Sequence, residues 1–244
     1  MHARLPALAV LIGLLVPGAC AAQSMARSAQ LADTSAPTQS PPSKPVALQA
    51  LSANTVSAWA GGSFATGGPI GNIQRARVGL VGLRYHRLLL PSPSKTKTDG
   101  PTLTYTVDVF PVLLLSIPPN TVAAPFAREK PGPEESSVYQ EGMDAYGFGV
   151  GPAGLRLTSR VAKRVQPFVA GSTGLSYFSQ PIPNGLGRHL NFMFGVGAGV
   201  QIVLTSDLIL TAGYRYYHLS NGFRGQINPG IDANLLHLGV AMSQ

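Results

Sequence analysis

The sequence predicts an all-β protein, an eight-stranded antiparallel transmembrane β-barrel that follows a signal peptide and a disordered linker. Apolar residues alternate with small or polar residues between positions 190 and 204, and a period of two is typical of a strand. Similar segments bring the total to eight, and bacterial outer-membrane barrels of one chain have even strand numbers. Charged residues make up 11% of the 244 residues, against about 25% in soluble proteins.

Residues 1–22 have the order of a secretory signal peptide. A basic start precedes the apolar run 5–16, and small residues follow it. This run is too short for a good membrane span, so we predict export and cleavage after Ala21 or Ala22. The rest of the chain has no apolar run long enough for a transmembrane helix, so a membrane form of the mature protein must be a barrel.

The single cysteine, Cys20, lies within the predicted leader. Disulfide frameworks and cysteine metal clusters are therefore excluded from the rest of the chain. Cys20 also leaves a lipoprotein signal open as an alternative, although Pro17 stands where an aliphatic residue is expected.

Residues 23–53 are rich in Ser, Ala, Pro, Gln and Thr and contain almost no aromatic residues. Such a segment cannot bury enough apolar area to offset its chain entropy. We therefore predict a disordered linker there, and a barrel domain over residues 54–244.

Eight segments of the barrel domain have the periodicity of strands. They are residues 54–64, 75–90, 102–116, 144–158, 166–178, 190–204, 207–218 and 233–243. Residues 205–207 fit a tight periplasmic turn, whereas the proline-rich stretch 117–143 falls where an outer loop is expected. The connection at 95–100 is long for a periplasmic turn.

A soluble β-sandwich or a lipocalin-like barrel is the alternative, because short alternating strands with Gly-rich turns describe those folds too. The second face of the 190–204 segment is small and carries Gly195, Gly197 and Gly199. A soluble barrel normally places Lys and Glu on its exterior. The Gly-rich face and the low charge therefore favour the membrane barrel.

The formal charge of +8 suits nucleic acid or an anionic membrane surface. No nucleic-acid motif is present, which favours anionic lipid. Three arginines are predicted near the outer end of the barrel and are candidates for contacting lipopolysaccharide phosphates, with ordinary solvated charge as the alternative: Arg188, Arg215 and Arg224. The histidines at positions 86, 189 and 237 lack the spacing of metal ligands, so we expect no metal site.

The segment that begins at Leu208 has an apolar, lipid-facing set of even-numbered residues, which includes Tyr214 and Tyr216 as members of an outer aromatic girdle. His218 belongs to the same set. If the extended backbone continues, Ser220 lies beside it, close enough for imidazole to accept the serine proton.

Asp232 opens the last predicted strand, which is antiparallel to the segment with His218 and Ser220, and it has the parity of the apolar residues there. It is the candidate acid for orienting the base. These three side chains are predicted to meet on the outside of the barrel, at the outer membrane surface. The alternative is a chance His-x-Ser pair, followed by a simple turn at Asn221 and Gly222.

Two short runs, YHLSNG at 217–222 and NPGID at 228–232, together resemble the signature of the PagL family of lipid A 3-O-deacylases. That family has an eight-stranded outer-membrane barrel and a His-x-Ser-Asn motif, with an acidic residue some twelve positions after the serine. Ser220 and Asp232 are twelve positions apart. This chain departs from the best-known members in using Asp instead of Glu, and in ending without an aromatic residue.

The resemblance implies an outer-membrane serine esterase that removes an ester-linked 3-hydroxyacyl chain from the lipid A of lipopolysaccharide. In that reading Ser220 is the nucleophile, His218 is the general base and Asp232 is the orienting acid. Asn221 and Gly222 contribute to the oxyanion hole.

We expect lipopolysaccharide and outer-membrane lipids as partners, with no nucleic acid and no cofactor, and we leave a homodimer open. The rival hypothesis is a non-enzymatic small outer-membrane barrel, an adhesin or a structural protein. His218 and Ser220 are then merely interfacial residues.

Overall fold

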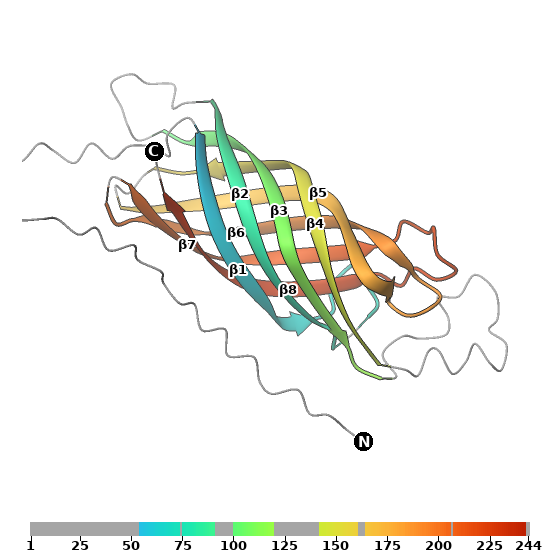
Figure 1. Ribbon diagram of the computed structural model, residues 1–244. Coiled ribbons are helices and arrows are strands. Elements are labelled where there is room, and N and C mark those ends of the chain that lie inside the picture. The colour runs from blue at the N-terminus through green and yellow to red at the C-terminus, as the bar shows by residue number, and fades with distance from the viewer. Residues whose placement is uncertain are drawn as a thin grey trace, which may run out of the picture. The chain divides into compact units, whose positions relative to one another are not determined.

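The computed structural model describes residues 54–73, 75–90, 100–119, 142–160, 164–205 and 207–242. Eight antiparallel strands form a closed barrel, in which each strand pairs with the next and β8 pairs with β1 (Figure 1). Their bounds are β1 Asn54–Thr66, β2 Arg77–Leu90, β3 Thr102–Ile117, β4 Met143–Thr158, β5 Val165–Ile182, β6 Arg188–Val203, β7 Leu208–Ser220 and β8 Ile231–Met242.

The predicted fold class is confirmed, and every predicted strand is present. The ends differ most in β5, which continues to Ile182 because its last residue pairs with Arg188 at the start of β6. β7 continues to Ser220, as the predicted site requires. The predicted signal peptide, the linker, and most of the loop at 117–143 lie outside the described residues. Within the described ranges, no helix is long and apolar enough to cross a membrane.

The outer wall of the barrel carries exposed apolar side chains, and part of its interior holds buried charged ones. On β8, Leu236 and Leu238 are 59% and 66% exposed on the outer wall. In the interior, the Nε of Arg84 donates to Asp108 at 2.7 Å, and both side chains are buried. A soluble barrel carries mostly polar side chains on its exterior, because water solvates that face. The arrangement therefore agrees with the membrane barrel and disagrees with the soluble alternatives.

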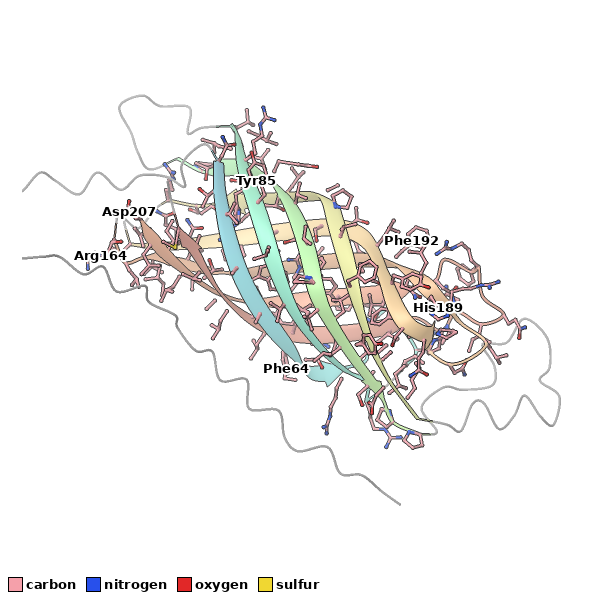
Figure 2. The ribbon with its side chains drawn as sticks, viewed as in Figure 1. Phe64, Tyr85, Arg164, His189, Phe192 and Asp207 are labelled. Atoms are coloured by element: carbon pink, nitrogen blue, oxygen red, sulfur yellow. The ribbon has the colours of Figure 1, made fainter. Side chains whose placement is uncertain are left out.

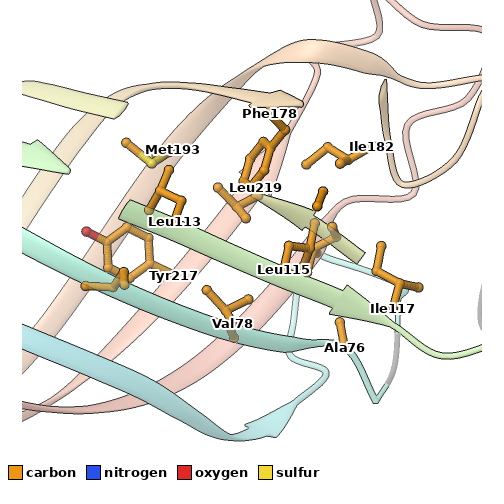
Figure 3. Close-up of a cluster of buried hydrophobic side chains, with 14 of the residues drawn as sticks. Ala76, Val78, Leu113, Leu115, Ile117, Phe178, Ile182, Met193, Tyr217 and Leu219 are labelled. Atoms are coloured by element: carbon orange, nitrogen blue, oxygen red, sulfur yellow. The ribbon is translucent and has the colours of Figure 1, made fainter. Parts of the chain in front are cut away.

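One end of the interior is filled by a cluster of buried apolar side chains (Figure 3). Ile117 and Phe178, near the ends of β3 and β5, are 2% and 1% exposed. Burying side chains of this size stabilises the fold by about 1.5–3 kcal/mol each. The cluster supports the ends of the strands that carry the predicted site.

The strand register identifies the two ends of the barrel. Val56 pairs with Met242, so the chain enters and leaves the barrel at the same end. Outer-membrane barrels begin and end on the periplasmic side. The turn between β6 and β7 lies at that end, closed by a hydrogen bond from Leu204 N to Leu208 O at 3.0 Å, as predicted. Figure 2 shows Asp207 at this end and Phe192 toward the opposite, outer end.

The connection between β1 and β2 lies against the loop that precedes β8. Asn72 N donates to Pro229 O at 2.8 Å, and Ile73 N donates to Gly230 O at 3.2 Å. Ile73 is fully buried and forms an isolated parallel bridge with Ile231. We call residues 67–73 the β1–β2 loop. Its packing holds it against the end of the barrel where the predicted site lies.

Candidate active site

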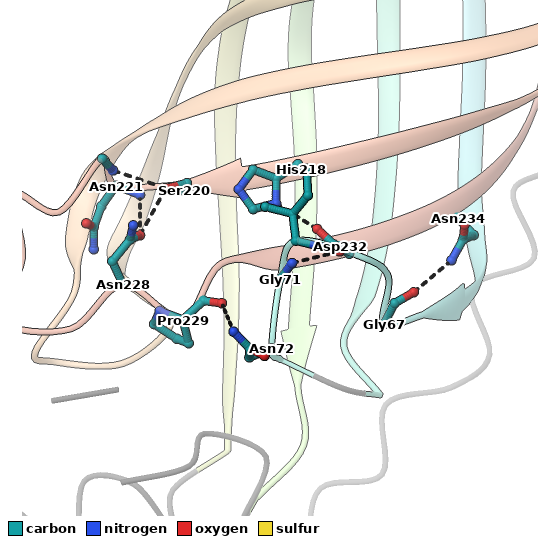
Figure 4. A network of polar contacts seen from close by, with 12 residues as sticks. Gly67, Gly71, Asn72, His218, Ser220, Asn221, Asn228, Pro229, Asp232 and Asn234 are labelled. Atoms are coloured by element: carbon teal, nitrogen blue, oxygen red, sulfur yellow. Dashed lines mark hydrogen bonds and ion pairs between the residues drawn. The ribbon is translucent and has the colours of Figure 1, made fainter. Parts of the chain in front are cut away.

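His218 and Asp232 form a close polar pair. They stand directly opposite one another in the β7–β8 ladder, and His218 Nδ1 lies 2.6 Å from Asp232 Oδ1 (Figure 4). An ionised carboxylate only accepts hydrogen bonds, so Nδ1 carries the proton in this contact. The neutral ring then presents its other nitrogen, Nε2, as a base. The predicted contact between His218 and Asp232 is therefore present.

Asp232 is fully buried, although its position on β8 directs it to the outside of the barrel. The β1–β2 loop covers it. The backbone N–H groups of Ile70 and Gly71 donate to Asp232 Oδ2 at 3.0 and 2.7 Å. With the contact to His218, the carboxylate has partners on both oxygens, which offsets the cost of burying its charge. The loop was not assigned to the site from the sequence, where no local pattern marks it.

Ser220 lies on the same face of β7 as His218, and its side chain is half-buried. Its hydroxyl donates to Asn228 Oδ1 at 3.0 Å and accepts from the N–H of Gly222 at 3.2 Å. Among the hydrogen bonds of the described residues there is none between Ser220 and His218. The structure therefore brings all three predicted residues to one wall, but directs the serine hydroxyl toward the loop that follows β7.

Asn228 is a member of the site to which the sequence analysis gave no role. Its Oδ1 accepts the backbone N–H of Asn221 at 3.0 Å as well as the hydroxyl of Ser220. These two donors fix the orientation of the side-chain amide through its Oδ1. The other end of the amide, Nδ2, is therefore held close to Ser220 as well (Figure 4). The signal available in the sequence was the position of Asn228 at the start of the NPGID run.

The side chain of Asn221 is buried within the β7–β8 loop. Its Nδ2 donates to Ile227 O at 2.7 Å, and its Oδ1 accepts the N–H of Gly225 at 3.4 Å. These contacts hold the turn that brings Asn228 back to Ser220. In this geometry the amide of Asn221 shapes the loop and does not contact Ser220.

Gly222 is the second residue predicted for the oxyanion hole, and its N–H points at the serine oxygen. Its φ is +63°, a conformation that residues with a side chain rarely adopt. A Cβ at this position would also lie 2.7 Å from a ring carbon of Phe192. Glycine is therefore required for the backbone amide to reach Ser220.

The aromatic residues of β6 border the site on the outer wall. Phe192 stands opposite Ser220 in the β6–β7 ladder, and Phe194 stands opposite His218. Their side chains are 46% and 43% exposed. His218 and Ser220 therefore lie beside an apolar surface that faces outward.

Two of the three predicted arginines lie at the outer rim. The Nε of Arg188 donates to the carbonyl of Arg224 at 2.7 Å, and the Nε of Arg224 donates to the carbonyl of Asn221 at 3.0 Å. The guanidinium of Arg224 also lies 4.8 Å from the ring centre of Phe192. Both arginines are exposed, so they stabilise the β7–β8 loop and keep a positive charge at the outer surface.

Two expectations about β7 are wrong. Arg215 is 3% exposed and hydrogen-bonds to Ser172 inside the barrel, because odd-numbered residues of β7 face the interior. It cannot meet lipopolysaccharide at the surface. Tyr216 faces outward but is 9% exposed, since Gly68 of the β1–β2 loop lies against it, whereas Tyr214 is exposed as predicted.

One family model matches the C-terminal part of the chain. The family model described as lipid A 3-O-deacylase (PagL) matches residues 130–241, which include β4 to β7, all of β8 but its last residue, and the candidate residues His218, Ser220 and Asp232. A search of curated proteins gave no match.

Among solved structures, the outer membrane enzyme PagL matches with a TM-score of 0.46 and 21% identity, over 77% of this chain and 98% of its own. Neisserial surface protein A matches with a TM-score of 0.44 and 16% identity, over 79% of this chain and 98% of its own. The N-terminal β-barrel domain of Pseudomonas aeruginosa OprF matches with a TM-score of 0.38 and 11% identity, over 78% and 97%. Residues 130–241 of this chain are therefore similar to the PagL family of lipid A 3-O-deacylases.

Proposed function

We propose that this chain is an outer-membrane lipid A 3-O-deacylase that removes an ester-linked 3-hydroxyacyl chain, with Ser220, His218 and Asp232 as its catalytic triad. The observation that carries the proposal is the 2.6 Å contact between His218 and Asp232 on the wall that also bears Ser220. A serine hydroxyl is a weak nucleophile by itself, and an oriented imidazole supplies the base that it needs.

The first half of the reaction forms an acyl-enzyme. Rotation about the Cα–Cβ bond of Ser220 turns the hydroxyl from Asn228 toward Nε2 of His218, which takes the proton as Oγ attacks the ester carbonyl. Collapse of the tetrahedral intermediate breaks the bond to the sugar oxygen. His218 returns its proton to that oxygen, and the sugar hydroxyl leaves. Asp232 stabilises the imidazolium that exists between the two proton transfers.

The negative charge on the tetrahedral oxygen needs donors that are already in place. The N–H of Gly222, 3.2 Å from Ser220 Oγ, is one candidate. Nδ2 of Asn228 is the other, because this amide is oriented by Asn221 N–H and touches the serine. Asn221 therefore contributes indirectly, by holding the loop and orienting Asn228.

The second half of the reaction restores the enzyme. A water molecule gives a proton to Nε2 of His218 and attacks the acyl carbonyl, and the same donors hold the second tetrahedral intermediate. Its collapse releases the 3-hydroxy fatty acid, and the proton returns from His218 to Ser220. No bound metal or cofactor takes part in these steps.

Lipid A reaches the site from the plane of the membrane. Its acyl chain lies along the apolar wall beside Phe192 and Phe194, and the charges of Arg188 and Arg224 at the rim lie toward its phosphates. Arginine suits phosphate because its planar fork donates two parallel hydrogen bonds. The homodimer stays a prediction that no contact described here supports.

The decisive experiment is mass spectrometry of lipid A after incubation with the folded protein or with its Ser220→Ala variant. Loss of one hydroxyacyl mass with the unchanged protein only is the expected result. Unchanged lipid A in both samples, with both barrels folded, would contradict the proposal and restore the non-enzymatic barrel as the better hypothesis.

A further inference from the structure

We propose that the β1–β2 loop is a positioning element of the triad, which holds the carboxylate of Asp232 toward His218 through backbone N–H groups. The inference rests on the proposed function, because it takes Asp232 as the triad acid. The loop touches no reacting atom and would act on the reaction only through that carboxylate.

The contacts of Asp232 divide between its two oxygens. Oδ1 lies 2.6 Å from His218 Nδ1, whereas Oδ2 accepts the N–H groups of Ile70 and Gly71 at 3.0 and 2.7 Å. Partners on opposite oxygens prevent rotation of the carboxylate about its Cβ–Cγ bond. Asp232 is also fully buried on a face that elsewhere meets lipid. The loop therefore both orients the carboxylate and separates it from the surroundings.

The loop is fixed to the strands that carry the triad. Asn72 N and Ile73 N donate to the carbonyls of Pro229 and Gly230, directly before β8. At its other end, Asn234 Nδ2 donates to Gly67 O at 3.1 Å. Contacts on both sides of Asp232 mean that the loop cannot shift as a unit without disturbing the carboxylate between them.

Two glycines allow the loop to approach so closely. A Cβ on Gly71 would lie 2.8 Å from both the backbone N and Oδ1 of Asp232. A Cβ on Gly68 would lie 2.5 Å from Oδ2 and 2.9 Å from a ring carbon of Tyr216. Distances this short are below van der Waals contact, so either side chain would force the loop and the carboxylate apart.

The test uses Gly71→Ala, with Gly68→Ala as a second variant that presses on the same carboxylate from another position. Gly62→Ala on β1 is the matched control, because a Cβ there meets nothing within 4 Å. Folding of each barrel is checked by its heat-dependent migration on gels. With purified lipid A in detergent micelles, we expect kcat to fall about 100-fold for the first two variants, as for a misplaced catalytic group, with KM nearly unchanged. The control should retain full activity.

A double-mutant cycle separates positioning from a general structural effect. In the Asp232→Asn background, Gly71→Ala should cause little further loss, because the group that it displaces is no longer a carboxylate. An equal loss of kcat in both backgrounds would overturn the inference.

The two proposals fail in different ways. If Asp232→Asn lowers kcat strongly while folded Gly71→Ala and Gly68→Ala retain full activity, the loop has no positioning role and the triad stands. If Asp232→Asn itself leaves kcat unchanged, the triad acid is wrong and the inference is overturned with it.

Discussion

The outward face of β8 has two ends with opposite character. Toward the periplasmic end, Leu236, Leu238 and Met242 are apolar and more than half exposed. Toward the outer end, the same face carries Asp232, which is polar and fully buried. The parity of the strand is the same throughout, so alternation along β8 does not explain the difference. The difference arises because the β1–β2 loop covers Asp232 and leaves the rest of the face bare.

The comparison shows how a membrane barrel accommodates a charged group on its outer wall. A carboxylate facing lipid without partners would be very costly, and a bare strand offers no free N–H groups, because its ladders use them. A loop from the other side of the β1–β8 seam brings unpaired N–H groups to the charge. The outer end of β8 thus becomes a polar site, while the rest of its face stays suited to lipid.

Replacing the buried acid at the outer end of β8 with an apolar residue should have the largest effect on kcat. Asp232→Leu places at the outer end the residue type that the bare part of β8 carries. We expect kcat to fall about 10⁴-fold, because His218 loses the group that fixes its tautomer and stabilises its charge. Deacylation of purified lipid A, followed by mass spectrometry, measures the loss. A folded variant with activity within tenfold of the unchanged protein would contradict the triad.

Substitutions of Asn228, in the loop before β8, test whether the polar site at the outer end includes this residue. Asn228→Asp keeps the oxygen that accepts the N–H of Asn221 but removes Nδ2, whereas Asn228→Ala removes both. We expect each to lower kcat by about 10²–10³-fold, since one oxyanion donor is lost. If Asn228→Asp retained activity and only Asn228→Ala lost it, Asn228 would serve the loop and not the oxyanion.

A charge at the bare end should destabilise the barrel and not the chemistry. Leu238→Arg puts a cation on the lipid face where no loop covers it, and we expect a loss of about 2–4 kcal/mol if this position lies near the bilayer midplane. Denaturant unfolding of the barrel in lipid vesicles measures it. Leu238→Ala is the control for lost apolar area. Equal stability of the Arg and Ala variants would indicate that this face does not meet the hydrocarbon.

The smallest expected effect comes from lengthening the acid. Asp232→Glu keeps the charge, but its extra methylene moves the carboxylate away from the N–H groups of Ile70 and Gly71 or into the loop. We expect about a tenfold loss of kcat, less than for Asp232→Leu, because His218 still has a carboxylate within reach. Unchanged kcat, measured in the same assay, would mean that the loop tolerates either length.

Much of the site followed from periodicity. The alternation along β7 and β8 placed His218 and Ser220 on one outward face, and the antiparallel ladder brought Asp232 opposite His218. The same parity rule assigns Arg215 to the interior, and its assignment to the lipopolysaccharide surface was wrong because it ignored that rule. Parity gives the direction of a side chain but not its exposure to solvent or lipid. Tyr216 therefore faces outward as predicted, although the β1–β2 loop covers it.

The sequence by itself determined the strand count, the parity of each strand and the spacing of the proposed triad, because a period of two and short antiparallel connections are local properties of the chain. The tertiary structure decided which outward residues are covered and which amides meet them. The contact from Gly71 N–H to Asp232 joins residues 161 positions apart, and it uses a backbone group that every residue except proline has. No residue type marks such a contact in the sequence, so only closure of the barrel, which brings β1 beside β8, makes it visible.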